Sequence, residues 1–353
     1  MQVLRFEGIP LDHPDFWVYE LDAALWREVV VGLYGDDDMA SLPVARWAEA
    51  QTPGYSRVLH LVAVDGDRRL GVCAIELPQR DNKHIAYFSV IVDPAHRRRG
   101  IGSALLEAGI QFCRGDGRTT FQGWTWEPLK PTGTRRLRGT HGDGELDADR
   151  ESVAFATRHG FELMQVETMS RMILPSQPEL EALARAVREA TSPDYKIVQW
   201  TGFSPEWADD VSALGRAMST DVPTGGADME EETMDEERLR LLDAARTRVG
   251  IERLHTAALH VPSGRLVAKS SIVRFAPGDE VADQWDTIVL REHRGRGLGW
   301  FIKSHNHAAL RRHWPEVRRL ITGNASENQW MLAINRRFGY EPFAASGWFQ
   351  RKG

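Results

Sequence analysis

The chain has 353 residues, a length that predicts two domains. Its 44 Lys and Arg against 50 Asp and Glu give a net charge of −6, which argues against a nucleic-acid-binding protein. With 42% hydrophobic and 27% charged residues it has the composition of a folded globular protein, and no segment holds the roughly 18 apolar residues of a membrane span.

The first seven residues lack a basic stretch followed by an apolar run, so we expect no signal peptide and a cytoplasmic location. Two cysteines, Cys73 and Cys113, are too few for a disulfide framework or a cysteine-rich zinc site and are expected to be buried. The 12 histidines show no H-E-x-x-H or similar spacing, so no metal site is predicted.

The first half of the chain predicts a mixed order of strands and helices. A short strand ending in glycine is followed by a hairpin that turns through Asp65-Gly66-Asp67. A further apolar strand leads into an arginine-rich loop and a helix. A polar stretch over residues 115–150 is interpreted as an inserted loop. The predicted strands cover residues 3–7, 57–64, 70–77 and 87–92, and the helix covers residues 103–113.

The same order of elements returns in the second half. The pattern Arg-x-x-Gly-x-Gly occurs at residues 97–102 and again at residues 294–299. Each copy ends in a glycine followed by an aromatic residue, Gly160-Phe161 and Gly339-Tyr340. The second copy predicts strands at residues 196–201, 254–261, 266–273 and 287–290 and a helix at residues 300–313.

Between the copies, apolar residues recur at helical spacing over residues 178–190, which predicts a connecting helix. We therefore predict a mixed α/β chain built from two copies of one unit. The predicted domains cover residues 1–175 and 195–353, and a connecting helix or linker covers residues 176–194.

A strand that runs into Arg-x-x-Gly-x-Gly and then a helix is suited to anion binding. Glycine adopts positive φ and lets the backbone approach a phosphate, and the free N–H groups of the first helical turn favour negative charge. The arginines add charge and paired donors. Neither copy is a P-loop, which needs Gly-Lys-Ser/Thr. Neither is a dinucleotide fingerprint, because Leu105 and Ile302 stand at the third glycine.

Both copies resemble the GNAT acetyltransferase superfamily, and the plan of the chain is similar to that of mycothiol synthase. The resemblance implies two tandem GNAT domains, each a mixed, mostly antiparallel sheet flanked by helices, with a loop that holds the pyrophosphate of acetyl-CoA beside a splayed strand. In the second copy it assigns cofactor contacts to Val289, Leu290, Arg294, Gly295, Arg296, Gly297, Leu298 and Gly299. In the first copy it assigns them to Val92, Arg97, Arg98, Arg99, Gly100, Ile101, Gly102 and Ser103.

The resemblance also implies that the two copies are not equivalent. The family often carries an Asn that bonds the cofactor and, seven positions later, a Tyr that acts as general acid. Counting back from the final glycine places Asn328 and Asn335 there in the second copy, but Asp149 and Ala156 in the first. Asn328 is also suited to be a helix N-cap, and the two roles are compatible.

The family often uses an acidic residue on the strand before the loop as the base toward the incoming ammonium. The second copy offers Asp286 and Asp283 there, and Asp is uncommon inside a strand, whereas the first copy has Ser89 in place of Asp286. We therefore expect the chemistry in the second half, with Asp286 as the base and a backbone N–H near Val289 or Leu290 stabilising the oxyanion. The general acid is unassigned.

The resemblance predicts N-acetylation of a primary amine by acetyl-CoA in a ternary complex. The acceptor is expected to be a small molecule, and acidic residues at 36–38 and 228–232 either favour a cationic one or are solvated helix starts. Two alternatives stay open: an acyl-CoA-binding protein without turnover, and a transferase acting on a lysine or N-terminus of a protein. No nucleic-acid or membrane partner is expected, and the chain is predicted to be a monomer or homodimer.

Overall fold

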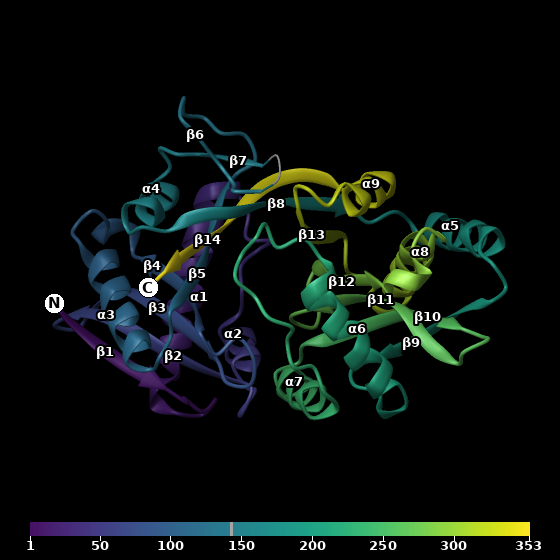
Figure 1. Ribbon diagram of the computed structural model, residues 1–353, viewed down its shortest axis with the longest axis horizontal. Helices are drawn as coiled ribbons and strands as arrows, with labels where there is room; N and C mark the ends of the chain where they lie inside the picture. Colours follow the sequence, from purple (N-terminus) through teal and green to yellow (C-terminus); the bar gives the residue numbers. More distant parts are fainter. Residues whose placement is uncertain (142–143) are drawn as a thin grey trace.

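The computed structural model describes residues 1–141 and 144–353. Its centre is one 12-stranded sheet that runs through both halves of the molecule, in the order β1-β2-β3-β4-β5-β14-β8-β13-β12-β11-β10-β9 (Figure 1). Most neighbouring strands are antiparallel, and the pairs β4–β5 and β12–β13 are parallel. No helix in the described part of the chain is long and apolar enough to cross a membrane.

The first copy contributes strands β1 to β8 and helices α1 to α4. Its elements are β1 (Gln2–Glu7), α1 (Trp17–Tyr34), α2 (Pro43–Glu49), β2 (Ser56–Asp65), β3 (Arg68–Pro78), β4 (Ile85–Val92), α3 (Ile101–Gly115), β5 (Thr120–Pro128), β6 (Arg136–Arg138), β7 (Glu145–Asp147), α4 (Glu151–Arg158) and β8 (Glu162–Ile173). The hairpin of β2 and β3 and the helix after the arginine-rich loop were predicted and are confirmed.

After the helix α5 (Gln177–Ala190), the second copy contains the counterparts of most of these elements. They are β9 (Tyr195–Thr201), α6 (Ala208–Asp221), α7 (Glu236–Arg248), β10 (Glu252–His260), β11 (Arg265–Arg274), β12 (Val281–Val289), α8 (Leu298–His313), β13 (Arg319–Ala325), α9 (Gln329–Phe338) and β14 (Glu341–Lys352). The predicted connecting helix is α5, which begins at a capping box formed by Ser176 and Glu179 and buries Leu180, Ala184 and Val187.

The prediction of an inserted loop over residues 115–150 was wrong in part. Its beginning forms β5, whose residues Thr120–Gly123 pair with β4, so only residues after Pro128 are inserted. Part of that insertion forms the small two-stranded sheet β6–β7. The glycine and threonine residues of the stretch favoured the prediction of a loop. The segment forms a strand because it pairs with β4 and β14 and because Phe121 is fully buried. Residues 142–143 of the insertion lie outside the described residues.

The last strand of each copy joins the sheet of the other copy. Strand β14 lies between β5 and β8, and β8 pairs on its other edge with β13, so these two long strands bridge the halves (Figure 1). The packing follows the pairing: Phe349 of β14 is 1% exposed within the core of the first half, and Met172 of β8 packs in the core of the second. The two copies therefore share one continuous sheet.

A second exchange involves residues 222–235, the segment between α6 and α7. Although it belongs to the second copy, it crosses the sheet of the first, where the Gln122 side chain donates to the Asp228 carbonyl at 2.9 Å. The Glu230 N–H donates to Asn82 Oδ1 at 2.7 Å, and Ala227 packs against Trp348. The segment covers part of the face of the first half.

Candidate functional site

The two arginine-rich loops have the same backbone shape. Gly297 caps α8 with φ +75°, and Gly100 caps α3 with φ +81°. Two residues earlier, Gly295 has φ +76°, while Arg98 adopts the same left-handed conformation at φ +61°. A Cβ added at Gly297 or Gly100 would meet no atom within 4 Å, so space remains above each helix N-terminus for a ligand.

The first arginine of each loop stabilises the loop through a hydrogen bond to the preceding strand. Arg294 Nε donates to the Val289 carbonyl at 3.0 Å, and Arg97 Nε donates to the Val92 carbonyl at 3.1 Å. Arg294 also pairs with Asp221, at the end of α6, at 2.7 Å. These contacts hold the end of the strand against the loop, so the two guanidinium groups are already engaged.

A cavity of about 300 Å³ opens between β12 and β13. The two strands pair in parallel only over Val281–Asp283 and Arg319–Ile321, and the cavity begins where this pairing ends. It is lined by Glu167, Met218, Val222, Pro223, Gln284, Trp285, Asp286, Thr287, Lys303, Thr322, Gly323, Asn324, Ala325, Asn328 and Met331. Of the predicted site residues it brings together Asp286 and Asn328, and the loop at residues 294–299 lies at the start of α8, less than two turns before Lys303.

Asp286 lies on the cavity wall in an ion pair. Its carboxylate accepts from the buried Lys269 Nζ at 3.0 Å and is 43% exposed. Burial alone would raise the pKa of the Asp286 carboxyl, but the charge and hydrogen bond of Lys269, with Arg246 farther away, lower it below its ordinary value. The carboxylate is therefore ionised at neutral pH.

Asp283, the other predicted carboxylate, is not part of the cavity wall. Burial raises its pKa to about 7, against a hydrogen bond from Trp285 that acts in the opposite direction. Its charge acts on the Tyr340 hydroxyl, whose pKa is raised well above the ordinary value, first by burial. Asp283 thus belongs to the packing beneath the sheet.

Two residues of the cavity were not predicted from the sequence. Glu167 comes from β8 of the first copy and reaches the second half only through the strand exchange. Burial and the nearby Glu327 raise the pKa of its carboxyl. Lys303 of α8 is 1% exposed and donates to Asn335 Oδ1 at 2.7 Å, and Asn335 in turn donates to Asn324 Oδ1 at 2.6 Å. A lysine on the buried face of an amphipathic helix was the signal available for Lys303.

Asn328 is the N-cap of α9, as its alternative role predicted, because its Oδ1 accepts from the Met331 N–H at 3.2 Å. That bond leaves the amide N–H₂ group at the cavity wall. We expect Asn328→Ala to cost about 1 kcal/mol of stability, whereas Asn328→Ser keeps the cap. Both should weaken acetyl-CoA binding about threefold to tenfold if the amide contacts the ligand. Urea unfolding and calorimetric titration separate the two roles; equal affinity in all three proteins would leave Asn328 with the cap alone.

The first half differs at the corresponding places. Leu106 and Ala156 stand where the second half has Lys303 and Asn335. Ser103 of the loop is hydrogen-bonded to His159 Nε2 at 2.9 Å, and the Phe155 ring lies 3.4 Å from a Cβ placed on Gly102. On β5, Trp124 stacks on Trp348 with ring centroids 5.5 Å apart. This half presents apolar and aromatic groups where the second half has a polar cavity wall.

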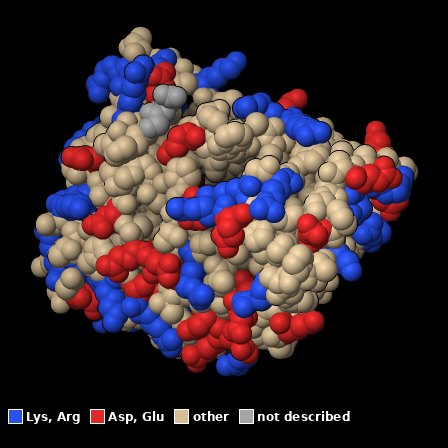
Figure 2. Space-filling view, turned by 45° about the vertical axis from the view of Figure 1, so that its right-hand side comes forward, with Lys and Arg blue, Asp and Glu red and all other residues tan. Residues whose placement is uncertain are grey.

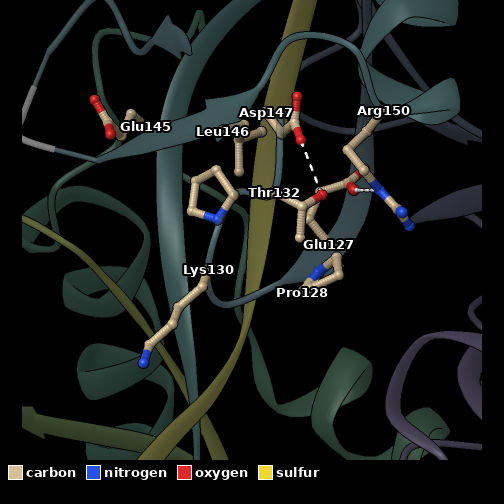
Figure 3. A pocket seen from close by; sticks show the side chains of 9 residues that line it. Glu127, Pro128, Lys130, Thr132, Glu145, Leu146, Asp147 and Arg150 are labelled. Carbon is tan, nitrogen blue, oxygen red and sulfur yellow. Dashed lines mark hydrogen bonds and ion pairs between the residues drawn. The ribbon is translucent and has the colours of Figure 1, made fainter. Parts of the chain in front are cut away.

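A second, much smaller cavity of about 10 Å³ lies beside the β6–β7 sheet. Four of its polar side chains are bonded in pairs: Arg150 bonds Glu127 at 2.8 Å and Thr132 bonds Asp147 at 3.3 Å (Figure 3). The space is about that of one water molecule, and the groups around it already have partners. It therefore offers no room for an organic ligand.

The acidic stretches at residues 36–38 and 228–232 are neither helix starts nor part of the cavity. Asp36 pairs with Arg171 at 2.9 Å, and Asp38 pairs with Arg319 at 2.8 Å. Asp228 contacts His84 at 3.1 Å and Lys352 at 3.2 Å. The expectation of solvated helix starts was wrong, because the loops that carry these residues form ion pairs between elements. The preference for a cationic acceptor stays a prediction. Acidic and basic side chains are interspersed over the face shown in Figure 2.

Comparisons with known proteins agree with this geometry. Residues 18–128 match the acetyltransferase (GNAT) family. A tandem GNAT protein from the clavulanic acid biosynthesis pathway is 24% identical and superposes with a TM-score of 0.75, over 99% of this chain and 98% of that one. No curated protein matches the sequence.

Two further solved structures share the fold at lower identity. A GCN5-related N-acetyltransferase from Sphaerobacter thermophilus is 16% identical, with a TM-score of 0.58 over 99% of this chain and 95% of its own. A putative acetyltransferase from Pyrococcus horikoshii is 11% identical, with a TM-score of 0.53 over 99% and 89%. These likenesses extend over the whole chain and therefore include both copies.

Proposed function

We propose that the chain is a tandem GNAT acetyltransferase whose second half transfers an acetyl group from acetyl-CoA to a primary amine of a small molecule, supported by the family match of residues 18–128 and by the fold shared with a tandem GNAT protein. The observation that carries this proposal is the cavity between β12 and β13. Its wall includes the ionised Asp286 and Lys303 of α8, the helix whose N-terminus follows the arginine-rich loop. Binding donor and acceptor together removes much of the entropic barrier of their encounter.

Acetyl-CoA fits the second half in two places. The N–H groups after Gly297, at the positive end of α8, suit the pyrophosphate, and Arg296 adds charge beside them. The gap between β12 and β13 suits the extended arm that ends in the thioester, because the unpaired edges of two strands provide backbone donors and acceptors. The thioester then lies beside Asp286 and Asn328.

The oxyanion that forms at the thioester carbonyl needs a donor on the cavity side of β12. The Leu290 N–H is already bonded to the Val267 carbonyl at 2.9 Å, on the β11 side. Successive N–H groups of a strand point to opposite edges, so the Val289 N–H is directed to the cavity edge. Val289, of the two predicted donors, is therefore assigned this role.

An amine acceptor is a cation in water and must lose a proton before it attacks. Asp286 is ionised and accessible from the cavity, so it can hold the ammonium and receive its proton through water. Glu167 faces the same space with a raised pKa, and Met218, Val222 and Met331 supply apolar walls. This combination suits a compact aliphatic amine.

The test compares one substitution in the two loops, Gly297→Asp and Gly100→Asp. Asp at Gly297 places a carboxylate beside the pyrophosphate in a left-handed conformation, and no neighbouring atom obstructs it. We expect acetyl-CoA affinity of the second site to fall roughly 100-fold and turnover to be lost, because two charges repel at close range. With Gly100→Asp we expect turnover to persist. Calorimetry and thiol release on a panel of amines and peptides measure both.

The other outcomes are informative. Turnover lost only in Gly100→Asp would move the chemistry to the first half. Tight acetyl-CoA binding without acetyl transfer to any acceptor would make the protein an acyl-CoA-binding protein. Transfer to peptides but not to small amines would make it a protein-modifying enzyme.

A further inference from the structure

Lys303 is a buried lysine on the wall of the cavity with no carboxylate beside it. It is 1% exposed, and its Nζ donates to Asn335 Oδ1 at 2.7 Å. Within the described residues no acidic group forms an ion pair with it, and the rings of Phe338 and Tyr340 lie 5.9 and 5.1 Å from Nζ. Burying an ammonium without a counterion costs free energy, which suggests that Lys303 has a functional role.

The neighbours of Lys303 fix its Nζ at the floor of the cavity. Asn335 stands where the resemblance expected a tyrosine acid, and it holds Nζ through Oδ1 while its own amide donates to Asn324 of β13 at 2.6 Å. Asn324 and Lys303 both line the cavity. A chain of three polar side chains thus crosses from α8 through α9 to β13, and both of its ends line the cavity.

We infer that Lys303 donates the proton to the departing sulfur of CoA, which rests on the acetyl transfer proposed above. The acceptor nitrogen attacks the thioester carbonyl carbon, and the C–S bond then breaks with its electron pair passing to sulfur. The Lys303 ammonium gives one proton to that sulfur, which leaves the CoA thiol and a neutral lysine. The acceptor nitrogen loses two protons, one before it attacks and one as the amide forms, and each passes in turn through Asp286 and water to solvent. Solvent returns one proton to the lysine.

The protonation of Lys303 suits this step. Burial lowers its pKa to about 7, so it can release a proton near neutral pH, unlike an ordinary lysine. The other titratable groups around it are His307 on α8, whose pKa is held well below the ordinary value, first by burial, and Tyr340 on β14, whose pKa is raised. Asp286 and Glu167 line the same cavity.

The first copy supports the assignment by contrast. At the corresponding position of α3 it has Leu106, which is 3% exposed in an apolar core, and Ala156 replaces Asn335. The helix therefore does not need a lysine for folding at this point. The polar pair occurs only in the half that also carries Asp286.

The experiment compares Lys303→Met and Lys303→Arg with the wild-type protein, with kcat followed by thiol release from pH 6 to 9.5. The matched control is Leu106→Met, the same helix position in the first copy. In the wild type, kcat should fall as the pH rises through about 7, because the acid form of Lys303 disappears. Lys303→Met should lower kcat about 100-fold below pH 7 and abolish that fall, with KM for acetyl-CoA nearly unchanged. Lys303→Arg should be equally slow, because a guanidinium does not release its proton.

A second substitution and a stability measurement separate chemistry from packing. Asn335→Tyr added to Lys303→Met supplies a different acid at the same place and should restore part of kcat. A lysine with a lowered pKa makes the unfolded chain bind more protons than the folded one. The Tm of the wild type should therefore rise relative to that of Lys303→Met between pH 7 and about 10.

Wild-type kcat and an unchanged pH profile in Lys303→Met would overturn the assignment. An acetyl group found on Lys303 Nζ by mass spectrometry during turnover would overturn it as well, because the lysine would then be a nucleophile. A wild-type protein that releases no thiol with any amine instead refutes the proposed function itself.

Discussion

Replacing Asp286 with Asn is expected to lower kcat by about 10²–10⁴-fold, the usual contribution of a positioned base. The KM for acetyl-CoA should change little, because the carboxylate faces the acceptor and not the phosphates. The amide oxygen of Asn still accepts the hydrogen bond from Lys269, which the carboxylate accepts at 3.0 Å, so the fold should be retained. Initial rates of thiol release at saturating acetyl-CoA measure the effect.

The matched control is Glu167→Gln, the same change at the other carboxylate of the cavity. Asp286 has a lowered pKa and Glu167 a raised one, so each has an argument for the base: the first is always ionised, the second is more basic. We expect the larger loss of kcat in Asp286→Asn. A larger loss in Glu167→Gln, with Asp286→Asn near the wild type, would transfer the role of base to Glu167.

Truncating Phe349 to Ala is expected to destabilise the protein by about 3–5 kcal/mol, the range for removing a buried aromatic side chain. Phe349 belongs to the second copy but is 1% exposed in the core of the first half. Protection of backbone amides against hydrogen exchange should therefore fall in α3 and β5 of the first half. Urea unfolding combined with hydrogen exchange measures both quantities.

The control for this prediction is Glu341→Ala, an exposed position on the same strand, which should change stability by less than about 0.5 kcal/mol. Loss of protection confined to the second half after Phe349→Ala would contradict the shared core. Equal effects of the two substitutions would contradict the burial of Phe349.

Features carried by neighbouring residues were predictable from the sequence. The two Arg-x-x-Gly-x-Gly loops, the hairpins and α5 depend on positive φ at glycine, on turn residues and on apolar periodicity, which act over a few residues. The N-cap role of Asn328 follows from its place before α9. Strand β5, within the stretch predicted as a loop, was not predicted from the sequence, because it is stabilised by pairing with its neighbours and not by its own composition.

The candidate site was predictable only in part. Asp286 was identified because the family resemblance implies an acidic residue on this strand, where Asp is otherwise uncommon. Lys303 and Glu167 were missed because their roles depend on the tertiary structure. Most lysines are exposed, and only the fold shows that Lys303 is buried. Glu167 lies on a strand of the first copy, and only the pairing of that strand with β13 places it in the cavity of the second half. The hydrogen bonds by which Arg294 and Arg97 stabilise their loops were not predictable either, because they depend on the position of the carbonyl groups at the strand ends.

The sequence by itself determined that this protein repeats one α/β unit, each copy with an Arg-x-x-Gly-x-Gly loop between a strand and a helix. Only the tertiary structure decided that the last strands change places, so that β14 completes the first half and β8 brings Glu167 into the second. The physical reason is the range of the interactions. Turns and helix ends are specified by local backbone preferences, whereas a strand with a suitable apolar face can pair with any open edge, and long-range packing selects the edge.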